Sequence, residues 1–421
     1  MNETIQKYTE YCLNCVVKPC SQKGCPLNND IPAFIKQVKE ENVKEAYKIL
    51  SKTTVLGSVC GRICPHLKQC EGSCVRGIKG EPVQIGEIEA YVFDEALNNK
   101  WYKELEKTEE LKGKKVAVVG GGPAGLTCSA FLARSGAEVT IYEKYGKLGG
   151  ILEHGIPDFR LSKDVLENTI ESILSLGINV EYNKELGKNI ALQELEKSYD
   201  AIFLSFGANI PSKTNIEGED LEGVFGGNSL LETGKHPDYT GKKVAVIGGG
   251  NVAMDCSRKI KRLGADKVYV IYRRAEKQMP AEIKEIAEAK EEGIEFLFQN
   301  NIVKILGNKK VEKIECIKTE LVKKEGETRE VPVNIENSNY QMDMDYVVMA
   351  VGSSPEKKLV ENLGIELNKW GYIKVDENHR TSNPKIYAGG DVAGDKGTVA
   401  WAARAGRDVA EEIKRDLILT Y

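Results

Sequence analysis

One glycine-rich pattern occurs twice in this chain, and the second copy begins 128 residues after the first. The copies are Lys114–Gly125 (KKVAVVGGGPAG) and Lys242–Ala253 (KKVAVIGGGNVA). Each combines a short apolar strand, a glycine turn and a run with helical spacing, and a second strand follows. The glycines allow a tight turn and close backbone approach to a pyrophosphate, which rests at the N-terminus of the helix. The pattern predicts an α/β fold with two Rossmann-like dinucleotide-binding domains.

The two copies differ at the end of the strand that follows the turn. In the first copy this strand ends at Glu143, and a carboxylate there accepts hydrogen bonds from ribose hydroxyls, which suits FAD or NAD. In the second copy the strand ends at Arg273 and Arg274, whose guanidinium groups suit the 2′-phosphate of NADP. Two solvated surface arginines are the alternative interpretation. We therefore expect FAD at the first turn and NADP(H) at the second.

A third glycine segment, Tyr387–Asp391 (YAGGD), precedes a run with helical spacing from Thr398 to Ile413. Such a segment can contact ribityl hydroxyls and phosphate, and the helix dipole can stabilise a reduced flavin. Two strand–glycine segments, Ala201–Ala208 and Tyr346–Gly352, resemble crossover strands between domains. We therefore expect the NADP(H) domain to be inserted in the FAD domain, with boundaries at 111–238 and 346–421 for FAD and 239–345 for NADP(H).

Eight of the eleven cysteines fall within the first 74 residues, in two groups of four. Cys-x2-Cys spacing and two Cys-Pro pairs are typical of iron–sulfur ligands, because iron clusters require soft thiolates. Two zinc sites remain an alternative, whereas disulfides are disfavoured because Met1–Tyr11 lacks an apolar leader. Between the groups, apolar spacing over Pro32–Lys52 predicts one or two helices, and a further helical stretch is expected over 85–107. Residues 1–110 are thus expected to form a small helical domain that holds two clusters.

The composition limits the partners and the compartment. The net charge of −4 does not indicate nucleic acid, and no apolar stretch is long enough to predict a membrane span. The expected compartment is a reducing cytoplasm. Cys128 and Cys256 are expected to be buried core thiols, too far apart in sequence for the Cys-x-x-Cys of a disulfide reductase. Electrons would therefore leave the flavin through the clusters, and no side-chain catalyst is predicted.

These features resemble the NADPH-dependent glutamate synthase small (β) subunit family. Its relatives include the flavin subunit of bifurcating ferredoxin:NADP oxidoreductases and the N-terminal half of dihydropyrimidine dehydrogenases. The resemblance covers essentially the whole chain and rests on these segments: Cys60–Pro65, Cys70–Gly77, Pro82–Glu89, Gly120–Thr127, Gly155–Leu161, Gly248–Asp255, Tyr272–Arg274, Met279–Ala281 and Gly389–Asp391.

The resemblance implies how the cysteines are shared between two [4Fe–4S] clusters. One cluster would use Cys12, Cys15, Cys20 and Cys74. The other would use Cys25, Cys64 and Cys70 with a side-chain oxygen from Glu89, and Cys60 is either spare or an alternative ligand. Four residues separate Cys20 from Cys25, which departs slightly from the family, so the number of clusters is the firmer expectation.

The expected nucleotide contacts complete the site. For FAD they are Gly120, Gly122, Pro123, Ala124, Gly125, Glu143, Gly150, Arg160, Gly207, Gly390, Asp391 and Thr398. For NADP they are Gly248, Gly250, Asn251, Val252, Arg273, Arg274 and Gly352.

Three functions fit these expectations. The first is an NADPH-oxidising subunit that passes electrons through FAD and two clusters to a partner such as the glutamate synthase large subunit. The second is an electron-transfer subunit of a ferredoxin:NADP oxidoreductase or a dihydropyrimidine dehydrogenase complex. The third is a zinc-bearing flavoprotein that binds or regulates without passing electrons on.

Overall fold

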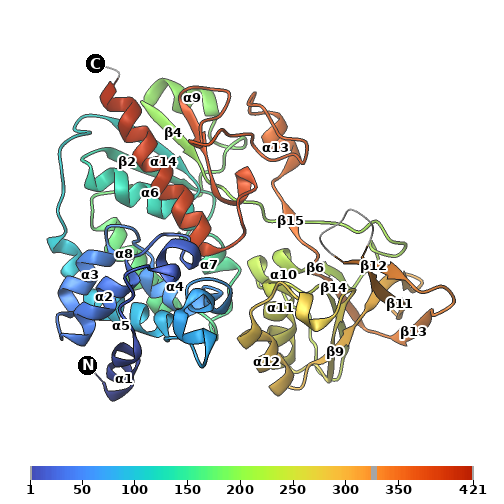
Figure 1. Ribbon diagram of the computed structural model, residues 1–421. Helices are drawn as coiled ribbons and strands as arrows, with labels where there is room; N and C mark the ends of the chain where they lie inside the picture. The colour runs from blue at the N-terminus through green and yellow to red at the C-terminus, as the bar shows by residue number, and fades with distance from the viewer. Residues whose placement is uncertain (1, 324–329, 420–421) are drawn as a thin grey trace. The chain divides into compact units, whose positions relative to one another are not determined.

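The computed structural model describes residues 2–323 and 330–419, in two compact units (Figure 1). The first unit consists of Met1–Ala208 together with Pro355–Tyr421, and the second of Asn209–Ser354. The second unit therefore interrupts the first in sequence, as the expected insertion requires. No helix in the described ranges has both the length and the apolar character that a membrane crossing requires.

The first unit begins with a helical region. Its helices are α1 (Glu3–Tyr11), α2 (Ile31–Lys39), α3 (Val43–Leu50), α4 (Gly57–Ile63) and α5 (Ile85–Asn98), with short turns η1 (Cys20–Gly24), η2 (His66–Lys68), η3 (Glu71–Ser73), η4 (Val75–Ile78) and η5 (Trp101–Glu104). Asp30 caps α2 by accepting a 3.3 Å hydrogen bond from the Ala33 N–H. The expected stretch over 85–107 ends earlier as an α-helix, because Lys100 adopts a left-handed backbone conformation.

A five-stranded parallel sheet follows, in the order β16-β4-β1-β2-β3. Its strands are β1 (Lys115–Val119), β2 (Glu138–Glu143), β3 (Asn179–Tyr182), β4 (Ala201–Leu204) and β16 (Ile386–Ala388). The helices of this region are α6 (Pro123–Arg134), α7 (Ile151–His154), α8 (Lys163–Leu174), α9 (Leu192–Ser198), α13 (Lys357–Glu361) and α14 (Val399–Leu419), with the turn η7 (Gly390–Ala393). Four of the five residues of β1 are buried, as expected of a parallel sheet covered on both faces.

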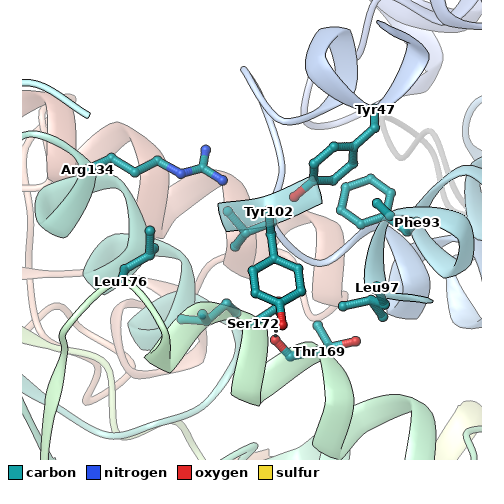
Figure 2. A pocket seen from close by; sticks show the side chains of 11 residues that line it. Tyr47, Phe93, Leu97, Tyr102, Arg134, Thr169, Ser172 and Leu176 are labelled. Carbon is teal, nitrogen blue, oxygen red and sulfur yellow. Dashed lines mark hydrogen bonds between the residues drawn. The ribbon is translucent and has the colours of Figure 1, made fainter. Parts of the chain in front are cut away.

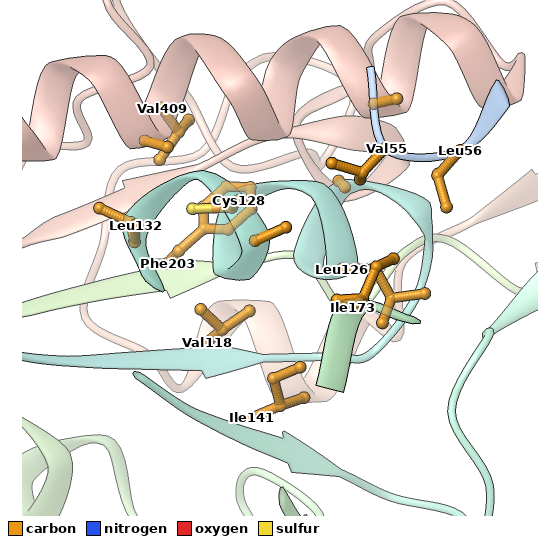
Figure 3. Packing of buried hydrophobic residues seen from close by; sticks show 14 of the residues in the cluster. Val55, Leu56, Val118, Leu126, Cys128, Leu132, Ile141, Ile173, Phe203 and Val409 are labelled. Atoms are coloured by element: carbon orange, nitrogen blue, oxygen red, sulfur yellow. The ribbon is translucent and has the colours of Figure 1, made fainter. Parts of the chain in front are cut away.

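The core of the first unit joins its helical region to its sheet. Figure 3 shows Val55 and Leu56, which precede α4, packed in one cluster with Leu126 of α6 and Val409 of α14. Helices α14 and α6 lie side by side (Figure 1), and their closest approach is at Gly406, where an added Cβ would come within 2.1 Å of the Ala124 carbonyl oxygen. The first 110 residues therefore belong to the same compact unit as the sheet.

The second unit repeats this strand order. Its parallel sheet runs β6-β14-β7-β8-β9, so β7, β8 and β9 occupy the places of β1, β2 and β3. The strands are β6 (Val224–Gly226), β7 (Lys243–Ile247), β8 (Lys267–Tyr272), β9 (Glu295–Phe298) and β14 (Tyr346–Met349). The helices are α10 (Gly227–Thr233), α11 (Asn251–Arg262) and α12 (Ile283–Glu291), with the turn η6 (Glu276–Gln278).

An antiparallel sheet not anticipated from the sequence follows β9. It contains β10 (Asn300–Leu306), β11 (Lys313–Val322), β12 (Val331–Asn334) and β13 (Tyr340–Asp343), and β11 pairs with the other three. A two-stranded ribbon of β5 (Ile210–Pro211) and β15 (Ser353–Ser354) joins the two ends of the second unit.

The second unit starts about thirty residues before the expected boundary at 239, and it ends at Ser354 rather than at 345. The reason is strand pairing. β6 forms the outer strand next to β14 in the second sheet, and α10, which follows β6 directly, packs on α11. The thiol of Cys256 on α11 lies 3.6 Å from the carbonyl oxygen of Gly227 on α10, which ties this early segment to the unit.

Candidate cofactor sites

The first glycine turn lies between β1 and α6. Gly120 has a φ of +104°, which favours glycine. At Gly125 an added Cβ would come within 1.9 Å of the Gly120 carbonyl oxygen, so only glycine lets α6 begin this close to the turn. Pro123 and Ala124 form the first turn of α6. The turn thus exposes backbone close to a helix N-terminus, which is the geometry that a pyrophosphate needs.

Glu143 lies beside this turn at the end of β2. Its side chain is buried, and its two oxygens accept hydrogen bonds from the Gly121 N–H (2.9 Å) and the Tyr145 N–H (3.0 Å). The Gly149 N–H donates to the Gly121 carbonyl (2.8 Å), which draws the next loop onto the turn. The Cα of Gly122 lies 2.9 Å from where a Cβ on Gly150 would be. The backbone therefore holds the carboxylate and both glycine segments together.

The third glycine segment, which contains Gly390, lies beside the first glycine turn. A Cβ on Gly390 would lie 3.3 Å from the Ala124 side chain, so η7 sits against the first turn of α6. Burial raises the pKa of Asp391, and the nearby Asp395 raises it further. The Asp391 carboxylate receives no hydrogen bond from any described side chain or backbone group. A half-buried carboxylate beside the first turn of α6 fits a ligand that supplies hydroxyl groups, as the ribityl chain of FAD does.

The remaining residues expected at FAD lie in the loops around this centre. Gly207 (φ +78°) follows Phe206, whose backbone touches Gly120. Thr398 directly precedes α14, and Arg160 lies in the turn between α7 and α8. The group as a whole fits FAD: a glycine turn, a backbone-held carboxylate and a half-buried carboxylate.

The second glycine turn lies between β7 and α11. Gly248 has a φ of +140°, and a Cβ there would come within 2.2 Å of the Ala350 carbonyl oxygen. Gly250 precedes Asn251 and Val252, which open α11, and the Asn251 side chain accepts a 3.0 Å hydrogen bond from the Glu282 N–H. Gly352 (φ +116°) follows β14. This segment therefore has the strand, glycine turn and helix N-terminus that dinucleotide binding requires.

Arg273 and Arg274 lie at the end of β8, beside this turn. Neither guanidinium forms an ion pair with a residue that the structure describes. Burial raises the pKa of the Tyr272 phenol, and the charges of Arg274 and Arg273 oppose that rise, so both groups lie near this ring. Two cations without an anionic neighbour fit the 2′-phosphate of NADP.

Four cysteines of the helical region face one cavity of about 350 Å³. They are Cys12, Cys15, Cys20 and Cys74, the set that the resemblance implies for one cluster. Burial and, to a smaller extent, the neighbouring Cys74 and Cys12 together raise the pKa of Cys20 to about 11. A bound metal would replace such thiol protons, since the thiolate is the ligand.

The other cysteines and Glu89 form a second group. Burial, with smaller contributions from the nearby Glu89 and Cys64, raises the pKa of Cys25 to about 12. Burial also raises the pKa of Glu89 to about 8, although the 3.2 Å hydrogen bond from the Asn29 amide lowers it in part. Cys70 lies near Cys25, Glu89 and Cys64, and Cys60 shares a hydrogen bond with Cys64. Five candidate ligands thus surround one place, so Cys60 and Glu89 both stay candidates for the last position.

A single zinc ion and a four-iron cluster require different spacings of their thiolate ligands. Within the described parts of the chain, no three His, Cys, Asp or Glu side chains converge on one metal-ion position. A zinc ion needs its thiolates about 2.3 Å from a single point. A four-iron cluster instead takes each thiolate on a different iron atom, so its ligands stand farther apart.

Several contacts of this second group come from α14 and were not predicted. Ala400 packs in one cluster with Cys64, and its backbone N–H opposes the rise in the pKa of that thiol. Arg404 donates to the Pro26 carbonyl (3.0 Å), and Arg407 donates to the Leu27 carbonyl (2.7 Å). No spacing pattern could reveal these contacts, because their partners lie more than three hundred residues away in sequence. Cys128 and Cys256, in contrast, are fully buried as predicted.

Two families match the chain. Residues 114–408 match the pyridine nucleotide-disulphide oxidoreductases, and residues 1–101 match the dihydropyrimidine dehydrogenase domain II with a 4Fe-4S cluster. Fold, sites and families together define an FAD- and NADPH-dependent oxidoreductase with an N-terminal 4Fe-4S domain.

The relatives narrow this class. The chain is 36% identical to the glutamate synthase [NADPH] small chain of Escherichia coli (strain K12), over 96% of this chain and 89% of that protein. It is also 36% identical to the oxidoreductase AegA of the same organism, over 97% of this chain but only 65% of AegA. The chain belongs to the glutamate synthase small-chain family.

A solved structure supports the fold. FprA from Mycobacterium tuberculosis, in complex with NADPH, superimposes with a TM-score of 0.64 at 20% identity, over 72% of this chain and 84% of FprA. This match confirms the expected α/β fold with two dinucleotide-binding domains.

Proposed function

We propose that this chain is the NADPH-oxidising subunit of a glutamate synthase and delivers electrons to a larger catalytic partner. The proximity of the Ala400 N–H to the Cys64 thiol carries the proposal. Because α14 starts just after the Gly390–Asp391 turn, this proximity supports a position for the second cysteine group next to the proposed FAD site. When bound, FAD accepts a hydride from NADPH and iron–sulfur clusters carry single electrons.

The residues of the chain bind and orient these groups. Glu143 is held by backbone donors to receive ribose hydroxyls, and Asp391 is placed to accept from the ribityl chain. Arg273 and Arg274 would select NADPH over NADH through the 2′-phosphate. The proposed ligands are Cys12, Cys15, Cys20 and Cys74 for one cluster, and Cys25, Cys64 and Cys70 with Glu89 or Cys60 for the other. We retain the proposed division into a cluster region (1–110), an FAD region and an NADP(H) region.

A surface beside the first cysteine group supports the binding of a partner subunit. Val16 is 96% exposed, and Val17 and Ile78 are exposed as well, close in sequence to Cys15 and Cys74. Exposed apolar side chains next in sequence to the proposed cluster ligands suit a protein interface. The name of the related small chain also implies a larger subunit. None of the eleven cysteines forms a disulfide. We propose the cytoplasm as the compartment of the protein.

The match of residues 1–101 to dihydropyrimidine dehydrogenase favours one alternative, an electron-transfer subunit of a pyrimidine-reducing or ferredoxin:NADP oxidoreductase complex. One assay separates the two functions. Dye reduction by NADPH and glutamate formation from 2-oxoglutarate and glutamine are measured with and without a candidate glutamate synthase large subunit. We expect dye reduction by the chain alone and glutamate only with the partner. Glutamate made by the isolated chain would overturn the proposal. Dye reduction without glutamate, even with the subunit that co-purifies from native extract, would favour the alternative.

A further inference from the structure

Two arginines of α14 hold the backbone beside the second cysteine group. Cys25 is a proposed ligand of that group, and Pro26 and Leu27 follow it directly. Arg404 donates a 3.0 Å hydrogen bond to the Pro26 carbonyl, and Arg407 donates one of 2.7 Å to the Leu27 carbonyl. Two cations therefore bind the chain immediately after a sulfur that we propose as an iron ligand.

The peptide bond between Pro26 and Leu27 connects Arg404 to this sulfur. Burial raises the pKa of the Cys25 thiol, and the N–H groups of Asn29 and Leu27 oppose that rise, so the Leu27 N–H lies near the sulfur. In a trans peptide the C=O and N–H groups point in opposite directions. The guanidinium at the carbonyl oxygen thus reinforces a dipole whose positive end lies near the sulfur, because hydrogen-bonded groups in a chain polarise one another.

A single carboxylate accompanies the two arginines. Asp408 accepts hydrogen bonds from Arg404 (3.2 Å) and from Arg407 (3.0 Å). The three side chains, two cations and one anion, together carry one net positive charge. The Arg407 side chain is only 14% exposed, so solvent screens its charge less than that of an arginine on the open surface.

The helical region is also fixed to the rest of the first unit just after α3. Arg134, which Figure 2 shows pointing from α6 toward Tyr47, donates a 2.8 Å hydrogen bond to the Ser51 carbonyl. Arg407 adds a 3.4 Å hydrogen bond to the Thr53 carbonyl. The charges on α14 therefore keep a fixed position relative to the second cysteine group.

We propose that Arg404, Arg407 and Asp408 set the reduction potential of the cluster held by the second cysteine group. This role rests on the proposed function and on its assignment of Cys25 as a ligand. Cluster potentials depend on the surrounding charge and on hydrogen bonds to the sulfurs, and reduction adds a negative charge. The net positive charge and the Leu27 N–H both favour the reduced state, so they raise the potential. The cluster beside the proposed FAD site thus becomes a better acceptor for single electrons.

Anaerobic redox titration of the cofactor-loaded protein, followed by electron paramagnetic resonance, tests this role. Cys70→Ser, which should lack the second cluster, identifies the signal of that cluster. Arg404→Gln should lower its potential, whereas Asp408→Asn, which removes the opposing charge, should raise it. Arg404→Lys keeps the charge and should retain most of the wild-type potential. The potential of the first cluster should stay unchanged in these three variants.

Arg415→Gln and Glu411→Gln are the matched controls, because each removes one charge from an exposed position on α14. Both should leave the two potentials unchanged. Iron content per chain shows that each variant is loaded, and if Arg404→Gln does not fold, Arg407→Gln provides the same loss of charge.

The outcomes separate this role from the proposed function. Two clusters whose potentials are the same in wild type, Arg404→Gln and Asp408→Asn would overturn the role of these side chains alone. Shifts of the same sign in the two variants would overturn it as well, because they would indicate a general disturbance of packing. A wild type with a single cluster would overturn the ligand assignment together with this role.

Discussion

Ala400 packs in the same core cluster as Cys64, and its backbone N–H opposes the rise in the Cys64 pKa that the Cys60 thiol and burial cause. Ala400 lies in the first turn of α14, where backbone N–H groups have no partner within the helix. A donor there favours the thiolate over the thiol, as does the positive end of the helix dipole. The start of α14 thus offsets part of the rise in the pKa of Cys64, next to the turn that we propose for FAD.

The first prediction concerns iron content. The wild-type chain, loaded under anaerobic conditions, should contain about eight irons and eight sulfides if both clusters are [4Fe–4S]. Cys70→Ser should remove about half of the iron and leave FAD bound, because the FAD contacts lie beyond residue 110. Iron, sulfide and flavin are measured per chain.

The control for this experiment is Cys316→Ser, since the Cys316 thiol lies in the second unit and bonds with Tyr340. It should keep the full iron content. Stoichiometric zinc with little iron in the wild type would refute the cluster assignment.

The second prediction concerns nucleotide choice. Replacing Arg273 and Arg274 together by alanine should weaken the binding of NADPH at least tenfold. The binding of NADH should stay nearly unchanged, because NADH has no 2′-phosphate. Each lost charge-assisted hydrogen bond is worth about 1.5–3 kcal/mol. Dissociation constants for both nucleotides provide the measurement, with exposed Lys284→Ala as the control. Equal losses for both nucleotides would contradict the assignment.

The third prediction uses two glycines of the first unit. Gly125→Ala should abolish FAD binding, because the new Cβ would lie 1.9 Å from the Gly120 carbonyl oxygen. Gly146→Ala is the matched change, since a Cβ there meets no atom within 4 Å. Flavin absorbance per chain after purification is the readout. A flavin content in Gly125→Ala equal to that of Gly146→Ala would show that the turn does not hold FAD.

The fourth prediction concerns pH and the second unit. Buried Arg258 donates a 2.8 Å hydrogen bond to Glu292, and Arg262 donates one of 2.7 Å. Burial alone would raise the pKa of Glu292, but these two arginines outweigh burial and lower it. The ionised carboxylate therefore stabilises the fold above its unfolded pKa of about 4.3, and this stabilisation is lost as the pH falls through the lower folded value.

Glu292→Gln should thus destabilise α11 and α12 by about 1.5–3 kcal/mol at pH 7. The difference from wild type should shrink as the pH falls below about 4. Hydrogen–deuterium exchange of α11 and α12 measures this loss of stability locally. Glu291→Gln, on the exposed face of α12, is the control. A difference that does not change with pH would exclude the ionised carboxylate as its cause.

Local chemistry explains what the sequence could predict. The glycine turns were predictable because tight backbone approach admits only glycine at Gly120, Gly125 and Gly248. Arg273 and Arg274 could be placed because they end a strand that follows such a turn. The start of the second unit could not be predicted, because β6 is a three-residue strand defined by its pairing with β14. The contacts of Arg404 and Arg407 were also beyond sequence reasoning, since the tertiary fold alone brings α14 to the helical region.

The pairing of β16 with β4 has a consequence for biosynthesis. Strand β16 and helix α14 leave the ribosome only after the whole of the second unit, yet they complete the sheet that β1 began. Domains fold as units during synthesis, so we expect the inserted unit to mature first while the nascent first unit is still open. The Pro26 and Leu27 carbonyls, beside Cys25, would meet Arg404 and Arg407 of α14 only at the last stage. Cluster loading and the final closure of the first sheet therefore belong to the same late step of maturation.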